Sequence, residues 1–310
     1  MKLVLVGLVA RAVCFDDEPS IWSDLGKLNR QVPIKEFPNP RFSGMSDVST
    51  LQQRFMDAAI SYCSHKHVFG FPCICDSSYK ESEVIVNKQS KSVVVVAINQ
   101  KTQRIVISYR PTMAWQNWKD NVAYSLVHMP NTPIGAQVHQ GFYRYYNSTI
   151  FKSTACVRRL LRDTRYKTYP IQIVGYSLGA AVAIVSLPGW VEILDTLRDT
   201  RGLEVIAYAG PRPGNEMLAE YLASFRVPIT RYTNRNDIVS HLPPRSLGFV
   251  HVGHEIHEKA NKDGKSTFIN CDDHFDEDPA CSYGTEGSYS ARRHMLPFNK
   301  FVPLPPFCMD

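Results

Sequence analysis

The sequence lacks several features that would define a class of protein at once. Its 310 residues contain no internal repeat, no low-complexity linker, no block of like charge and no pair of CxxC knuckles. Scattered Lys and Arg residues and a net charge of only +6 argue against a nucleic-acid partner, and the missing knuckles argue against a zinc site. Beyond the first twelve residues, no run looks long and apolar enough to cross a membrane. With 44% apolar and 21% charged residues, residues 13–310 are expected to form one globular domain.

The first twelve residues have the pattern of a short signal peptide. Lys2 precedes an apolar run that ends at Ala10, and Ala10-Arg11-Ala12 supplies small residues around a cleavage point. A buried N-terminal strand is the alternative, because the run is short and Arg11 interrupts it. We expect residues 1–12 to direct secretion and the mature protein to be extracellular.

The cysteine content agrees with export. Disulfides form and persist in oxidising compartments, so cysteines without zinc-type spacing favour disulfides over a metal. The sequon Asn147-Ser148-Thr149 adds a weak expectation of glycosylation at Asn147. The eight cysteines are Cys14, Cys63, Cys73, Cys75, Cys156, Cys271, Cys281 and Cys308.

Strand and helix patterns alternate through most of the chain. Two β-branched runs separated by four polar residues predict a hairpin, and the alternation that follows predicts parallel strands joined by helices. The fold class is therefore α/β, with a mostly parallel central sheet flanked by helices. Helices are expected at 47–63, 141–164, 178–187 and 215–225, and strands at 93–98, 104–109, 171–174, 203–208, 229–233 and 249–256.

Gly175-Tyr176-Ser177-Leu178-Gly179 matches the G-x-S-x-G motif of a nucleophile on a tight turn. The motif lies between a predicted strand and a predicted helix, which is the context that the chemistry requires. A phosphate-binding turn is the alternative, but such a turn normally has more glycines or a trailing Lys. Ser177 is therefore the candidate nucleophile, and the N–H of Leu178 is a candidate oxyanion donor.

A serine hydroxyl needs a base, and the base needs a carboxylate to orient it. Asp237 follows the predicted strand 229–233 and therefore lies at the carboxyl edge of the sheet, where α/β sites assemble. Its alternative role is that of a turn-forming Asp after Asn236. His294 is the favoured base because it comes after Asp237, in a late loop followed by apolar residues. By position alone, His241, His254 and His274 remain open.

Several segments together resemble the fungal triacylglycerol lipase family, often called class 3 lipases. The resemblance runs from about Ala58 to the C-terminus and implies the α/β-hydrolase fold with His294 as the catalytic His. One departure is Tyr176, where the family usually has His. The matching segments are Val138–Phe142, Ile173–Ala181, Gly210–Asn215, Asn236–Val239 and Leu242–Pro244.

The resemblance also implies residues that the motifs alone do not define. Thr112 is the second oxyanion donor, although Pro111 stands where the family has Gly. Residues 113–122 resemble a short lid helix over the active site, with Trp115 and Trp118 on its apolar stripe; a fixed surface helix is the alternative. Two disulfides are implied, Cys63–Cys308 and Cys271–Cys281, and Cys156 is expected to be a buried thiol within the long helix.

The expected function is extracellular hydrolysis of lipid carboxylic esters, as in a triacylglycerol lipase, through an acyl-enzyme on Ser177. The substrate is a lipid or ester at an oil–water interface, with peripheral contact to the lipid surface, and we expect a monomer. No metal or organic cofactor is needed by this chemistry. One alternative is a feruloyl-type or short-chain esterase or a phospholipase on the same fold. Another is an inactive lipase-like protein that binds lipid or a partner, suggested by Tyr176 and Pro111.

Overall fold

The computed structural model describes residues 48–62, 78–111, 124–261, 265–271, 277–285 and 289–299, which all lie in the compact unit Pro33–Asp310. Some sequence-based expectations fall outside these ranges. They are the signal peptide at 1–12, the lid helix with Trp115 and Trp118, the oxyanion residue Thr112, and the disulfide between Cys63 and Cys308.

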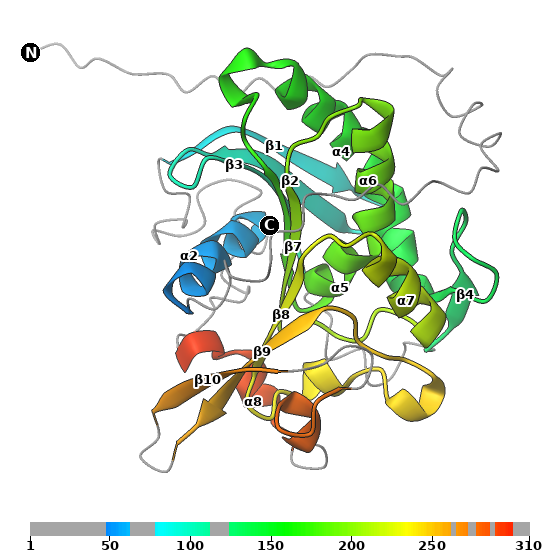
Figure 1. Ribbon diagram of the computed structural model, residues 1–310, viewed down its shortest axis with the longest axis vertical. Helices are drawn as coiled ribbons and strands as arrows, with labels where there is room; N and C mark the ends of the chain where they lie inside the picture. The colour runs from blue at the N-terminus through cyan, green and yellow to red at the C-terminus, as the bar shows by residue number, and fades with distance from the viewer. Residues whose placement is uncertain are drawn as a thin grey trace, which may run out of the picture. The chain divides into compact units, whose positions relative to one another are not determined.

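The described residues build an eight-stranded sheet in the order β1-β2-β3-β6-β7-β8-β9-β10 (Figure 1). The four pairs of neighbouring strands from β3 to β9 are parallel. The pairs β1–β2, β2–β3 and β9–β10 are antiparallel. This pairing confirms the predicted mostly parallel sheet. Strands β4 and β5 form a separate pair. The bounds are β1 Tyr79–Asn87, β2 Ser92–Asn99, β3 Arg104–Tyr109, β4 Leu126–His128, β5 Gln137–His139, β6 Ile171–Tyr176, β7 Leu203–Tyr208, β8 Ile229–Asn234, β9 His254–Ala260 and β10 Ser266–Asn270.

Helices cover both faces of the sheet. Helix α2 lies on one face, and α4, α5, α6 and α7 lie on the other (Figure 1). The α-helices are α2 Val48–Ala59, α4 Gln140–Arg162, α5 Leu178–Val185, α6 Leu187–Thr196, α7 Glu216–Ser224 and α8 Ala291–His294. Short 3-10 turns are η1 Ile60–Tyr62, η3 Thr164–Tyr166, η4 Ile238–His241, η5 Arg245–Leu247, η6 Ser282–Thr285 and η7 Pro297–Asn299.

Two expectations about elements were wrong in detail. The strand predicted at 249–256 begins only at His254, because Gly253 has φ of 90° and Val250 pairs instead with Gly214. His294 was expected in a loop, but it is the last residue of α8, a single turn whose N-cap side chain, Ser290, accepts a hydrogen bond from Arg293 N.

Leu178–Thr196, which spans α5 and α6, is long and apolar enough to cross a membrane by length and composition. The expectation that no later run meets this test was therefore wrong. Most of the stretch is buried inside the protein, where α5 packs against β6 and β7. Such burial is what a core helix of an α/β fold requires.

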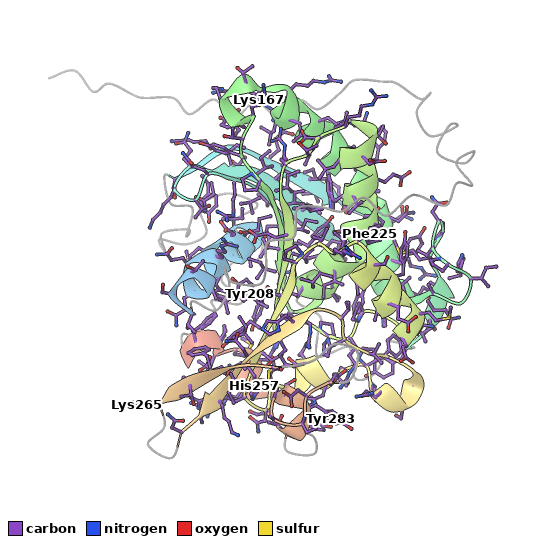
Figure 2. All side chains as sticks on the ribbon, viewed as in Figure 1. Lys167, Tyr208, Phe225, His257, Lys265 and Tyr283 are labelled. Carbon is purple, nitrogen blue, oxygen red and sulfur yellow. A yellow bond between two sulfur atoms is a disulfide. The ribbon has the colours of Figure 1, made fainter. Side chains whose placement is uncertain are left out.

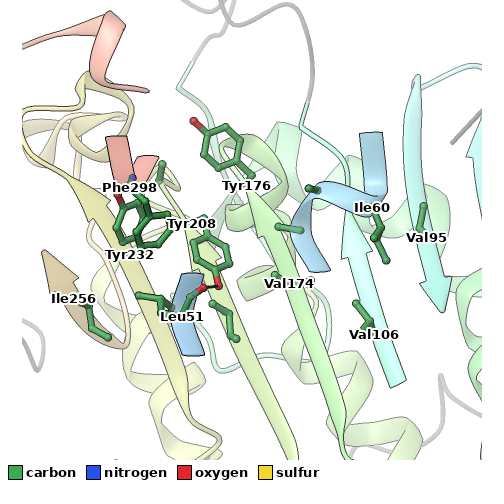
Figure 3. Packing of buried hydrophobic residues seen from close by; sticks show 14 of the residues in the cluster. Leu51, Ile60, Val95, Val106, Val174, Tyr176, Tyr208, Tyr232, Ile256 and Phe298 are labelled. Carbon is green, nitrogen blue, oxygen red and sulfur yellow. Dashed lines mark hydrogen bonds between the residues drawn. The ribbon is translucent and has the colours of Figure 1, made fainter. Parts of the chain in front are cut away.

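The core under α2 is unusually aromatic. Tyr176, Tyr208 and Tyr232 project from the consecutive strands β6, β7 and β8, and Phe298 stacks on Tyr232 with ring centroids 4.1 Å apart (Figure 3). Tyr208 lies in the interior (Figure 2) and its hydroxyl donates to Leu51 O at 2.7 Å. Buried phenols need such partners, because an unsatisfied hydroxyl in an apolar core is costly. The cluster joins α2 to the carboxyl half of the sheet.

Candidate active site

Ser177 lies on the turn between β6 and α5 and has φ of 56° and ψ of −128°. This backbone is strained for a residue with a side chain and holds the serine on a sharp bend. The flanking glycines are required by close approach: a Cβ on Gly175 would lie 2.2 Å from the Gly179 backbone, and one on Gly179 would lie 2.1 Å from Tyr109 O. The G-x-S-x-G pattern is thus explained by two backbone contacts.

Ser177, His294 and Asp237 form a continuous hydrogen-bonded chain. His294 Nε2 lies 2.8 Å from Ser177 Oγ, and His294 Nδ1 lies 2.8 Å from Asp237 Oδ2. The second carboxylate oxygen, Asp237 Oδ1, accepts a hydrogen bond from Val239 N at 2.9 Å. All three side chains are buried, with exposed fractions of 7%, 2% and 1%. A hydroxyl, an imidazole and a carboxylate in this order can transfer a proton away from the hydroxyl oxygen.

Local backbone pairing brings the carboxylate and the imidazole together. Residues Asp237 and Ser290 form an isolated parallel bridge, and Ser290 N donates to Asn236 O at 2.8 Å. Ser290 also caps α8, the turn that ends at His294. One residue therefore ties the segment after β8 to the start of the turn that carries the histidine.

A buried ion pair fixes the segment that follows Asp237. Arg212 binds Glu277 through two hydrogen bonds, at 2.7 and 2.6 Å, and also donates to the carbonyl oxygens of His241 and Pro243. Burial alone would raise the pKa of Glu277, but the Arg212 hydrogen bonds and the surrounding positive charge outweigh burial and lower this pKa to about 2. Both charges are more than nine-tenths buried and are satisfied by each other.

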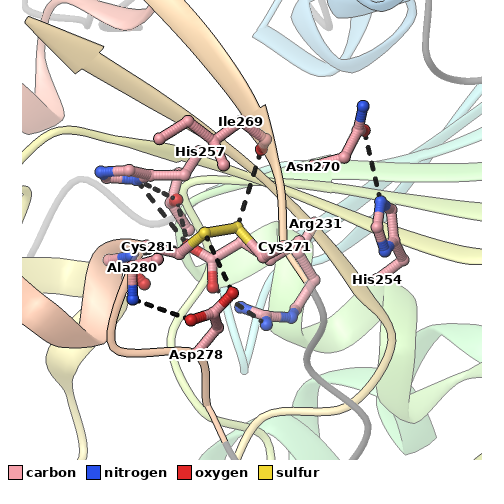
Figure 4. The surroundings of a disulfide bond; sticks show 12 residues. Arg231, His254, His257, Ile269, Asn270, Cys271, Asp278, Ala280 and Cys281 are labelled. Atoms are coloured by element: carbon pink, nitrogen blue, oxygen red, sulfur yellow. Dashed lines mark hydrogen bonds and ion pairs between the residues drawn. A yellow bond between two sulfur atoms is a disulfide. The ribbon is translucent and has the colours of Figure 1, made fainter.

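The loop that supplies Glu277 is closed by the Cys271–Cys281 disulfide, with Cα atoms 6.2 Å apart (Figure 4). This confirms one of the two expected bridges. Cys156 is buried in α4 as expected, and its thiol donates to Glu83 Oε2 at 2.6 Å. Among the described residues, Cys271, Asp278 and Cys281 are close enough to hold a metal, but the two sulfurs are already bonded to each other.

The other described histidines have different partners. His241 Nε2 contacts Thr285 Oγ1 at 3.1 Å, and His254 Nε2 contacts Asn270 Oδ1 at 3.4 Å. His257, on β9 (Figure 2), pairs with Thr233 Oγ1 at 2.9 Å. His251 Nε2 donates to Ser240 O at 2.8 Å, and burial with nearby Arg231 lowers the pKa of His251 to about 3, so this ring is neutral. His274, the remaining alternative, lies outside the described residues.

Leu178 is the first residue of α5, so its N–H has no acceptor within the helix and sits at the positive end of the helix dipole. It is the one predicted oxyanion donor within the described residues.

The predicted glycosylation sequon, residues 147–149, lies on α4. Asn147 is exposed, whereas Thr149 is buried and its hydroxyl donates to backbone carbonyls of the preceding turn.

Sequence reasoning missed two neighbours of His294. Tyr176 stacks on the imidazole, and Asn234 donates to the carbonyl oxygens on either side of the histidine, those of Arg293 and Leu296. The one sequence signal is that Tyr176 replaces the usual His of the family, a departure that by itself suggests inactivity. Asn234 gave no signal because a buried side-chain amide at a strand end is visible only in the fold.

The architecture defines an α/β-hydrolase fold, as a structural comparison confirms. The structure described as "A serine protease triad forms the catalytic centre of a triacylglycerol lipase" superimposes with a TM-score of 0.72 at 24% identity, covering 86% of this chain and 98% of that one. At this identity the likeness establishes the fold alone.

Comparison of sequences finds similarity to known lipases. Residues 106–247 match the model of the family described as Lipase (class 3). A lipase of Rhizomucor miehei is 31% identical over 166 residues, which are 52% of this chain and 43% of that protein. A chloroplastic phospholipase A(1) of Arabidopsis thaliana is 30% identical over 152 residues, or 45% of this chain and 33% of that protein. The chain is thus similar to class 3 lipases over about half of its own length, and it spans less than half the length of these two relatives.

Proposed function

We propose that the protein hydrolyses carboxylic esters of lipids through an acyl-enzyme on Ser177. The observation that carries this proposal is the chain of two 2.8 Å contacts from Ser177 through His294 to Asp237, on a strand–turn–helix bend. The match to the class 3 lipase family supports a lipid ester as substrate.

The reaction begins when Ser177 Oγ attacks the acyl carbon and its proton moves to His294 Nε2. Negative charge develops on the former carbonyl oxygen, where the N–H of Leu178 donates a hydrogen bond; Thr112 is proposed as the second donor. The intermediate then expels the alcohol, which takes the proton from His294. A water molecule, deprotonated by the same nitrogen, attacks the acyl-enzyme and releases the fatty acid.

Asp237 acts by holding the imidazole in one tautomer. Its Oδ2 accepts from His294 Nδ1–H, which leaves Nε2 as the proton acceptor that faces Ser177. The carboxylate also stabilises the imidazolium that forms in each half-reaction. The hydrogen bond from Val239 N keeps the carboxylate from rotating.

We further propose that the protein is secreted after removal of residues 1–12, as a single domain over residues 13–310. The Cys271–Cys281 disulfide supports an oxidising compartment. Trp115 and Trp118 would contact the lipid surface from a lid, the Cys63–Cys308 bridge would close nearly the whole chain, and Asn147 would carry a glycan.

Turnover of p-nitrophenyl esters of increasing acyl length tests the proposal, with Ser177→Ala as the matched inactive control. We expect wild-type turnover that favours long acyl chains and is abolished in the variant. A preference for short chains would instead assign an esterase. Cleavage of phosphatidylcholine in preference to triolein would assign a phospholipase, an outcome that the Arabidopsis relative makes worth measuring. Equal turnover by Ser177→Ala would refute the mechanism.

A further inference from the structure

We propose that Tyr176 is a positioning residue that sets the orientation of the His294 imidazole; this inference rests on the proposed function. Tyr176 is the variable residue of the G-x-S-x-G motif and immediately precedes Ser177. It is fully buried at the end of β6, in the aromatic core under α2. We assign its effect to the contacts that it makes with His294.

Two independent contacts join Tyr176 to His294. The hydroxyl of Tyr176 donates a hydrogen bond to the backbone carbonyl oxygen of His294. The phenol ring stacks on the imidazole, with centroids 5.1 Å apart and planes inclined by 22°. The hydroxyl thus fixes where the histidine backbone sits, and the ring limits how the imidazole can rotate about its side-chain torsions.

The phenol ring of Tyr176 is itself held in place by packing against α2. Phe55 of α2, which is half-buried and packs against the core cluster, meets the Tyr176 ring edge-on at a centroid distance of 5.7 Å. Figure 3 shows Tyr176 within this cluster. An aromatic ring packed between another ring and the core has little rotamer freedom. Because Tyr176 is held by the core and contacts His294, it restricts the motion of the histidine.

The turn that carries His294 is secured on its other side by Asn234. The amide nitrogen of Asn234 donates to Arg293 O at 2.6 Å and to Leu296 O at 2.8 Å. The carbonyls of residues 293, 294 and 296 are thus all bound by side chains from β6 and β8. The turn is short, and a single helical turn is marginal by itself, so these bonds add to the Ser290 bridge in fixing the position of the imidazole.

Two substitutions separate the contribution of the Tyr176 ring to kcat from that of its hydroxyl. His294 carries positive charge during each half-reaction, and an aromatic face within about 6 Å of a cation stabilises it. Tyr176→Phe keeps the ring and loses the hydroxyl bond, so kcat should fall about fivefold with KM unchanged. Tyr176→Leu loses both the hydroxyl bond and the aromatic face, so kcat should fall further than in Tyr176→Phe, again with KM unchanged.

Tyr208→Phe is the matched control. Tyr208 is equally buried on the adjacent strand β7, and its hydroxyl also donates to a backbone carbonyl, that of Leu51 in α2. Loss of the Tyr208 hydroxyl should lower the melting temperature as much as Tyr176→Phe does, while kcat and KM stay at wild-type values. This comparison separates positioning of His294 from a general contribution to stability.

The experiment measures kcat and KM on one p-nitrophenyl ester for the wild type and these three variants. A fivefold loss of kcat in Tyr176→Phe and a larger loss in Tyr176→Leu, with KM unchanged in both and wild-type kcat in Tyr208→Phe, support the proposal. Wild-type kcat in Tyr176→Phe, or an equal loss in Tyr208→Phe, overturns the inference and leaves the proposed function intact. A wild-type protein that hydrolyses no ester overturns both.

Discussion

Replacement of Glu277 by Gln tests the claim that the buried ion pair with Arg212 stabilises the fold around the segment that follows Asp237. The pKa of Glu277 is lowered from the ordinary value of 4.5 to about 2, because the Arg212 hydrogen bonds and nearby positive charges outweigh the effect of burial. At about 1.4 kcal/mol per pKa unit, this shift corresponds to about 3 kcal/mol of folding free energy at neutral pH. For a domain of this size, the melting temperature should fall by about 10 °C.

The pH dependence of this loss has a definite sign. A carboxylate with a depressed pKa in the folded state contributes its stability above the unfolded-state value and loses it as the pH falls toward the folded-state value. The difference between wild type and Glu277→Gln in urea unfolding should therefore be full at pH 7 and at pH 5, and should shrink to about half by pH 3.

Glu81→Gln is the control for this experiment. Glu81 pairs with Arg165 at 3.2 Å on the surface, where solvent screens the charges, so its replacement should leave the free energy of unfolding nearly unchanged. A melting temperature for Glu277→Gln within about 1 °C of the wild type at pH 7 would refute the reasoning about the buried pair.

Two further changes test the nucleophile turn and the Cys271–Cys281 disulfide. Gly179→Ala should prevent soluble folding, because the new Cβ would lie 2.1 Å from Tyr109 O. Gly202→Ala is the control and should express normally, because its Cβ would meet only Pro170 Cβ at 3.5 Å. Equal soluble yields of the two variants would contradict this reasoning. Cys271→Ser should lower the free energy of unfolding by about 2 to 3 kcal/mol, because the disulfide restricts the unfolded chain. Urea unfolding under non-reducing conditions measures this loss, and an unchanged midpoint would show that the disulfide adds no stability.

Strands of the sheet were predictable from the sequence where an apolar run is bounded by turn residues. The sequence predicts β2, β3 and the crossover from β6 through α5 to β7 because each of these strands is buried along nearly all of its length. Strand β1 was missed because it lies at the sheet edge and is largely exposed, which leaves a polar sequence without clear alternation. Strand β10, at the other edge, was missed for the same reason.

The candidate site was predictable to the extent that chemistry restricts residue type and chain order. Ser177 and Asp237 followed from the motif and from the carboxyl edge of the sheet, and the choice of His294 among several histidines needed the family resemblance. Tyr176 and Glu277 could not be found this way, because their contacts with His294 and Arg212 join residues 118 and 65 positions apart. Packing at such separations is determined by the tertiary fold.

The most direct test of the central claim is the reaction of the protein with a fluorophosphonate probe, followed by mass analysis of the labelled peptide. A serine whose proton is taken by a hydrogen-bonded histidine attacks such a phosphorus centre, and an ordinary serine does not. The account predicts a single stoichiometric adduct on Ser177 that disappears in His294→Ala. An unlabelled Ser177 in the folded protein, or equal labelling without His294, would contradict it.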